Sequence, residues 1–161
     1  MTPTAFGVKA AAAAALALFL LVGLVYTQVI AESGEREVPW QDVTGRLGPV
    51  PWPREQMHAV RSRGQLERVL RKATGRAAPK LPPIDFRRRT AVLAATGPRS
   101  SAGYDLHVIR VTARRDRVVV RLRERLLQPD RWAAARLTYP YRLITIPRTA
   151  KPLFFRPEGR P

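Results

Sequence analysis

Few side chains in this sequence have the types and spacing that catalysis needs. There are two histidines, His58 and His107, and no cysteine. No His-x-x-x-His spacing is present, so neither a zinc site nor metal catalysis is predicted. Ser101, Asp105 and His107 lie close in sequence, but no nucleophile elbow or oxyanion-hole pattern accompanies them. We therefore predict no catalytic residue, no cofactor and no metal, and a protein that is not an enzyme.

A loop of small and polar residues is a better candidate for function. The stretch TGPRSSAGYDLHV (96–108) separates two apolar runs, and loops at strand ends commonly present recognition groups. We predict a partner-contact surface from this loop and a later aromatic segment, comprising Pro98, Arg99, Ser100, Ser101, Gly103, Tyr104, Tyr139, Pro140 and Tyr141. The alternative is structural: Gly103 supplies a backbone angle and Tyr104 is a core aromatic.

The N-terminal region predicts the location. Ala10 to Ile30 carries no charge and is long enough, as a helix, to cross a bilayer. Lys9 precedes it and acidic residues follow it, which keeps the N-terminus cytoplasmic and the rest outside. We expect a single-pass protein of the cell membrane with an extracytoplasmic C-terminal domain. The alternative is a signal peptide cleaved before Glu32, which would make the domain secreted.

The net charge of +17 favours anionic partners. Specific nucleic-acid binding is not predicted, because no aromatic residues alternate with the arginines of the expected sheet and no helix-turn-helix or RNP-type pattern occurs. Unspecific binding to anionic polymers of the cell envelope is consistent with this charge, and such binding would be sensitive to salt.

The chain order predicts three parts: 1–31, the cytoplasmic N-terminus and anchor; 32–56, a Pro/Gly-rich juxtamembrane linker; and 57–161, a folded domain. Two tryptophans of the linker, Trp40 and Trp52, either pack on the domain or lie near lipid headgroups, and packing is the favoured interpretation. A helix is expected from Arg63 to Ala73, because Ser62 and Gln65 form a capping-box pattern and Gly75 suits its end.

Strands are expected after the helix. TAVLAATG (90–97) is typical of a buried strand, and GYDLHVIRVTA (103–113) with DRVVVRLRERLL (116–127) predicts an antiparallel hairpin. A turn centred on Arg115 places Asp105 opposite Arg125 and His107 opposite Arg123, as charge-neutralising pairs. A last strand is expected over 141–146. The fold class is α+β, a small antiparallel sheet with one packed helix, preceded by the N-terminal transmembrane helix.

Two stretches resemble a known family. GPRSSAGYDLHVIRV (97–111) and TYPYRLITIPRTAKPLFF (138–155) resemble the C-terminal domain of the protease-complex subunit PrcB family, and the order of elements agrees over about residues 60–157. Here SAGY replaces the family's usual Thr-Gly-Gly-Tyr and keeps Gly103 and Tyr104. The resemblance implies an exported or tethered module that stabilises a partner, such as a surface protease, and it brings no catalytic residues.

The same SAGY string is similar to the loop of chagasin-type cysteine-protease inhibitors, which insert small-residue loops into an active-site cleft. That β-sandwich needs more strands than are expected here and does not need the capped helix. We therefore expect a membrane-anchored, non-catalytic interaction module outside the cytoplasm. The alternatives are a protease inhibitor that presents this loop, or an envelope protein that binds polyanions without specificity.

Overall fold

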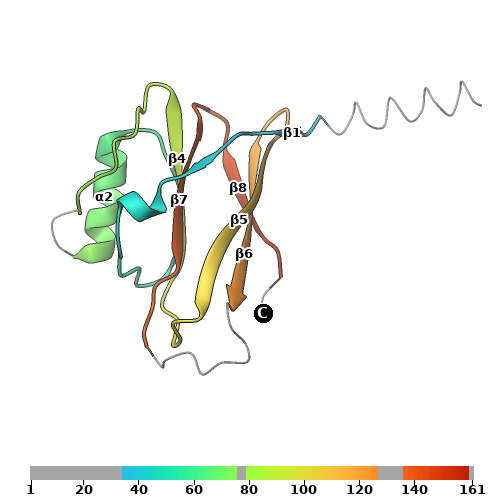
Figure 1. Ribbon diagram of the computed structural model, residues 1–161. Helices are drawn as coiled ribbons and strands as arrows, with labels where there is room; N and C mark the ends of the chain where they lie inside the picture. Colours follow the sequence, from blue (N-terminus) through green and yellow to red (C-terminus); the bar gives the residue numbers. More distant parts are fainter. Residues whose placement is uncertain (1–33, 76–78, 127–135, 160–161) are drawn as a thin grey trace, which may run out of the picture. The chain divides into compact units, whose positions relative to one another are not determined.

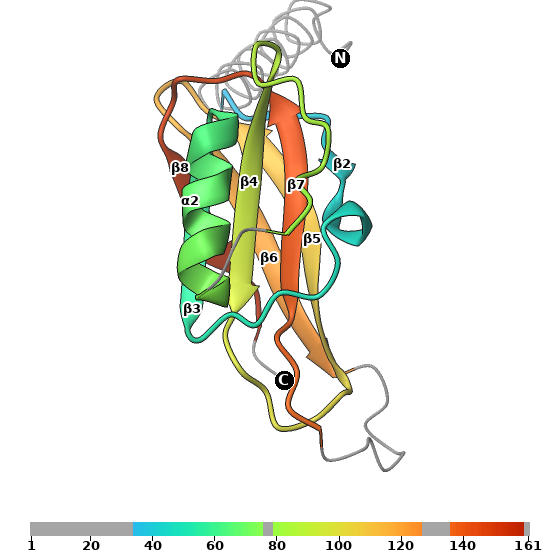
Figure 2. The same ribbon diagram turned by 90° about the vertical axis from the view of Figure 1, so that its left-hand side faces the viewer.

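Two four-stranded β-sheets face one another in the described chain, where a single sheet was expected. The computed structural model describes residues 34–75, 79–126 and 136–159. Among these residues one α-helix lies on the outer side of one sheet, so the fold is mostly β (Figures 1 and 2). The sheet strands are β1 (Arg36–Glu37), β5 (Tyr104–Ala113), β6 (Val118–Leu126) and β8 (Leu153–Pro157) in one sheet, and β2 (Gln41–Asp42), β7 (Tyr141–Pro147), β4 (Arg89–Thr96) and β3 (Glu55–Val60) in the other.

The central strands β4 and β7 are buried on both faces. Leu93 and Leu143 face the helix α2 (Arg63–Thr74), whereas Val92 and Ile144 face the opposite sheet. Strands covered on both sides have near-continuous apolar sequences, which explains why TAVLAA shows no alternation. Most strand pairs are antiparallel, but β8 pairs in parallel with β6. This last strand and its parallel pairing were not predicted.

The helix agrees with its sequence signals. Ser62 is the N-cap, and its hydroxyl accepts a hydrogen bond from the backbone N–H of Gln65 at 3.2 Å. Gly75 ends the helix with φ +63°, the left-handed conformation that glycine adopts without strain. Leu66 and Leu70 bury one face of the helix against the sheet. Local capping chemistry therefore determined both ends.

The expected linker is wrong from residue 36 onward, because these residues are part of the fold. They supply β1, β2 and the 3-10 helix η1 (Thr44–Arg46). Their apolar side chains belong to the core, including the fully buried Trp52, whose ring centroid lies 5.9 Å from that of Tyr141. The Pro and Gly content concealed this role, since apolar residues in an irregular segment have no period to detect. The domain begins near residue 36 instead of residue 57. Trp52 packs as expected, whereas Trp40 is 38% exposed.

The hairpin of β5 and β6 has the predicted register at its open end. Asp105 lies opposite Arg125 and His107 opposite Arg123, and a bulge between Val108 and Arg110 then shifts the register by one residue. The charge partner of Asp105 differs from the expectation. Its carboxylate accepts a hydrogen bond from Arg142 at 2.7 Å, because the twisted sheets bring β7 close to this end of β5.

The predicted membrane segment, Ala10 to Ile30, lies outside the described residues. Within the part of the chain that is described, no helix is both long and apolar enough to cross a membrane. The anchor therefore stays a prediction from the sequence.

Candidate contact surface at one end of the sandwich

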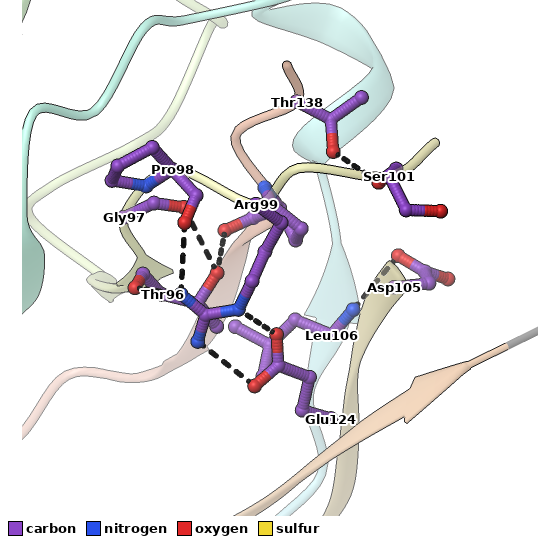
Figure 3. A network of polar contacts seen from close by, with 10 residues as sticks. Thr96, Gly97, Pro98, Arg99, Ser101, Asp105, Leu106, Glu124 and Thr138 are labelled. Carbon is purple, nitrogen blue, oxygen red and sulfur yellow. Dashed lines mark hydrogen bonds and ion pairs between the residues drawn. The ribbon is translucent and has the colours of Figure 1, made fainter. Parts of the chain in front are cut away.

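The two segments predicted to form a contact surface lie side by side. Arg99 and Thr138 form an antiparallel bridge, with N···O distances of 2.8 and 2.9 Å. The Thr138 hydroxyl also donates a hydrogen bond to the carbonyl of Ser101 at 2.8 Å (Figure 3). We call residues 97–104 and 138–141 together the loop pair. It lies at the end of the sandwich where β4 ends and β5 begins.

Arg99 holds the loop pair to the sheet. Its guanidinium binds both carboxylate oxygens of Glu124, at 2.6 and 2.9 Å, and donates to the carbonyls of Thr96 and Pro98 (Figure 3). The Glu124 side chain is only 13% exposed and that of Arg99 30%. The hydrogen bond to Glu124 raises the pKa of Arg99 above its ordinary value. Bidentate pairs of this kind are strong and directional, so Arg99 is a structural residue of the loop.

Glycine is required at Gly97. Its φ is +79°, and a Cβ at this position would lie 3.0 Å from backbone atoms of Arg54 and Glu55. The loop therefore begins in close contact with the backbone before β3. Gly103 is buried and does not have a positive φ, so the explanation by backbone angle applies to Gly97 instead. The N–H of Gly103 donates to the Ser101 hydroxyl at 3.1 Å.

The aromatic segment forms the inner part of the loop pair. Tyr141 is 8% exposed, and its hydroxyl donates a hydrogen bond to the carbonyl of Gly48. Burial raises the pKa of Tyr141 to about 12. Pro140 is buried and Tyr139 packs against the core cluster. Tyr139 and Tyr141 therefore contribute to packing, and their rings are not displayed as an exposed patch.

The exposed residues of the loop pair are few. Pro98 and Ser100 are exposed, as is Ala102, which the sequence prediction left out, and Tyr104 is half-buried. Sequence reasoning also missed Glu124. The signal was present, because Glu124 continues the inward series that contains Val120 and Leu122, and a charged residue at an inward position of a strand needs a partner.

The cavity beside the loop pair is small. A hollow of about 70 Å³ lies beside the Arg99–Glu124 pair, lined in part by Met57, Leu106 and Leu122. Pockets for small-molecule ligands usually measure roughly 300–1,000 Å³, so this hollow suits a few water molecules. The geometry is that of a fixed surface loop that can make contacts.

The side chains considered for catalysis serve other contacts. The Ser101 hydroxyl accepts from Gly103, and the carboxylate of Asp105 binds Arg142 and lies 3.2 Å from the His107 ring. In the described ranges, no group of three His, Cys, Asp or Glu side chains is placed to hold a metal ion.

Comparison with known proteins identifies part of the chain. No curated protein and no solved structure matches it. The family model PrcB C-terminal matches residues 90–147, which run from β4 through β7 and include the whole loop pair. The match is narrower than the resemblance noted over residues 60–157. Residues 90–147 therefore match the PrcB C-terminal family model, which confirms the resemblance that the loop and the final strand indicated.

Proposed function

We propose that the chain is a membrane-anchored, non-catalytic module that acts outside the cytoplasm and binds a protein partner through the loop pair. The observation that carries this proposal is the way the loop is held. The Arg99–Thr138 bridge and the Arg99–Glu124 pair fix a small-residue loop with Pro98 and Ser100 exposed. A loop that is already ordered loses little conformational entropy when a partner binds, which favours recognition.

The family supports the class of partner. The resemblance to PrcB implies a module that associates with and stabilises another protein, in that case a surface protease. A protease is therefore the first partner to test. The predicted anchor at residues 10–30 would keep the module at the membrane surface, where such a partner acts.

Cross-linking and capture of the tagged full chain from the membranes of its own cells tests this function. Wild type is compared with Ser100→Tyr, which places a bulky group on the loop pair. The matched control is Ala150→Tyr, at an exposed position near the opposite end of β4. We expect one partner to be captured at low and high salt, to be lost with Ser100→Tyr and to be retained with Ala150→Tyr.

Two outcomes would count against the proposal. If every captured protein is lost from the wild type at moderate salt, the basic surface acts by unspecific attraction alone. If Ser100→Tyr captures the same partner as wild type, the loop pair is not the contact surface.

Protease inhibition is a second candidate, and the β-sandwich favours it. One objection was the expectation of too few strands, and eight strands in two sheets are present in the described residues. The other objection stands, because such a sandwich does not need the capped helix α2. An inhibitor would present the exposed residues Pro98, Ser100 and Ala102 to an active-site cleft. Titration of the purified chain against a panel of cysteine proteases should then abolish activity at one equivalent. A flat titration across the panel eliminates this candidate.

A further inference from the structure

A groove of about 280 Å³ lies at the end of the sandwich opposite the loop pair. The strand β5 runs from the loop pair at Tyr104 to Ala113, which lines the groove, so the two features are a strand length apart (Figure 2). The groove has an apolar floor with Val38, Val118 and Ile146, and a rim with the basic side chains of Arg36, Arg148 and Lys151. One carboxylate, that of Glu37, also lines it.

Hydrogen bonds hold the rim in place. The backbone N–H of Arg148 donates to the carbonyl of Arg88 at 2.8 Å, and its guanidinium donates to the carbonyl of Phe86. The ammonium of Lys151 donates to the carbonyl of Arg114 at 2.8 Å. Each of these cationic groups has more N–H donors than this one bond uses. The bonds also gather segments 85–89, 113–118 and 147–152 at this end of the molecule.

These segments are rich in arginine and contain only two carboxylates, Asp85 and Asp116. Exposed arginines here include Arg87, Arg88, Arg114 and Arg115. Asp116 pairs with Arg117 at 2.6 Å, and Glu37 lies 3.9 Å from Arg110. At the other end of the sandwich, the Arg99–Glu124 and Arg142–Asp105 pairs neutralise their charges. The groove end therefore has basic groups in excess and favours an anionic ligand.

Exposed aromatic residues lie beside these basic groups. Phe154 is 48% exposed, and the guanidinium of Arg117 lies 4.8 Å from the centre of its ring. Trp40 is 38% exposed and follows Pro39, which lines the groove. Aromatic rings near basic side chains are characteristic of protein surfaces at the membrane interface.

The chain itself brings this end close to the bilayer. The predicted membrane segment ends at Ile30, and β1 begins in the groove at Arg36. Six residues span about 20 Å at most when fully extended. The groove is therefore within reach of the headgroups of the membrane that holds the chain.

We propose that this groove binds the phosphate of an anionic phospholipid headgroup. Arg36, Arg148 and Lys151 would surround the phosphate, and the glycerol region would contact the apolar floor. The inference rests on the proposed anchor and adds an orientation: the basic end lies against the bilayer and the loop pair faces away from it. A partner would then be met on the side remote from the membrane.

Because the sequence contains no cysteine, a single introduced cysteine can carry a fluorophore at a chosen position, which makes a direct test possible. The full chain is reconstituted in bilayers of zwitterionic lipid, with or without anionic phospholipid, and carries one fluorophore on either Ala150→Cys or Ser100→Cys. A quencher is placed on the lipid headgroups. With anionic lipid, we expect quenching at position 150 to be at least about fivefold stronger than at position 100, and to weaken with salt. Equal quenching at both positions, or no dependence on anionic lipid, would overturn the proposal.

Charge-reversal variants distinguish an effect of the groove from an effect of the overall net charge. Arg36→Glu with Lys151→Glu should abolish the preferential quenching at position 150. The matched control, Arg125→Glu with Arg156→Glu, changes the net charge equally at exposed positions outside the groove and should leave the quenching intact. Equal melting temperatures for the two double variants establish that both fold. If both lose the quenching equally, the groove has no special role and the proposal fails.

Two further measurements distinguish a lipid phosphate from a soluble one, and a failure of the groove proposal from a failure of the membrane anchor. If inorganic phosphate or polyphosphate changes the signal at position 150 in zwitterionic bilayers, while anionic lipid does not, a soluble anion is the ligand and the lipid assignment is wrong. If an alkaline carbonate wash removes the chain from the bilayer, the anchor of the proposed function fails. A retained chain without preferential quenching refutes the groove alone.

Discussion

Removing Arg99 from the Arg99–Glu124 pair should reduce the stability of the fold more than removing Glu124. Arg99→Leu leaves the Glu124 carboxylate, which is 13% exposed, without its cation. A buried charge that loses its partner costs roughly 3–5 kcal/mol, and the residual exposure puts the expected loss at about 3 kcal/mol. Glu124→Leu leaves Arg99, which is 30% exposed and can turn toward water, so the expected loss is about 1.5 kcal/mol.

The double variant gives the coupling. Arg99→Leu with Glu124→Leu places two apolar side chains beside Met57, Leu106 and Leu122. It still loses the Arg99 hydrogen bonds to the loop, so we expect a loss of about 2.5 kcal/mol and a coupling energy of about 2 kcal/mol.

Urea unfolding of the fragment 34–161, followed by tryptophan fluorescence, measures these values. In a thermal melt of the same fragment, a loss of 3 kcal/mol should lower the melting temperature by about 10 °C. Asp116→Asn, which breaks the exposed pair with Arg117, is the control and should not move the midpoint. The reasoning is refuted if Glu124→Leu costs as much as Arg99→Leu, or if the coupling falls below about 0.5 kcal/mol.

Three other perturbations have defined outcomes. Burial raises the pKa of Tyr141 to about 12, so this phenol ionises in the unfolded chain before it does so in the folded one. The free energy of unfolding of the wild type should therefore fall by about 2 kcal/mol relative to that of Tyr141→Phe as the pH rises from 10 to 12. If the urea midpoints of the two proteins change in parallel over this range, the burial of Tyr141 is contradicted. Gly97→Ala should cost more than Gly75→Ala, about 2 against 1 kcal/mol, because only Gly97 also meets backbone at 3.0 Å; equal midpoints would argue against this close approach. Ser62→Ala should lower the free energy of unfolding by about 1 kcal/mol, because the helix loses its N-cap hydrogen bond. Unfolding followed by circular dichroism measures this loss, and an unchanged stability would show that the cap is dispensable.

Local elements could be predicted where the physical cause is local. The helix ends at its caps because Ser62 and Gly75 satisfy backbone groups within a few residues of themselves. The alternating strand predicted the hairpin, but Asp105 lies opposite Arg125 only because the bulge between Val108 and Arg110 shifts the register that begins at the turn. The family loop could be recognised for the same reason, since it is continuous in sequence.

The early segment escaped prediction because its role is not local. Val43, Leu47 and Val50 are buried, but they follow no helical or strand period. They become core residues only because they pack against the sheet and the helix, which are formed by other parts of the chain. Composition alone therefore suggested a linker.

The sequence by itself determined the helix, its caps, the β5–β6 hairpin and the positions of the two candidate segments along the chain. Only the tertiary structure decided that β8 completes a second sheet, that Arg142 binds Asp105, and that Arg99 joins Glu124 to the loop pair. These contacts link residues far apart in the chain. Their formation depends on how the twisted sheets pack against each other, a property that no single segment encodes.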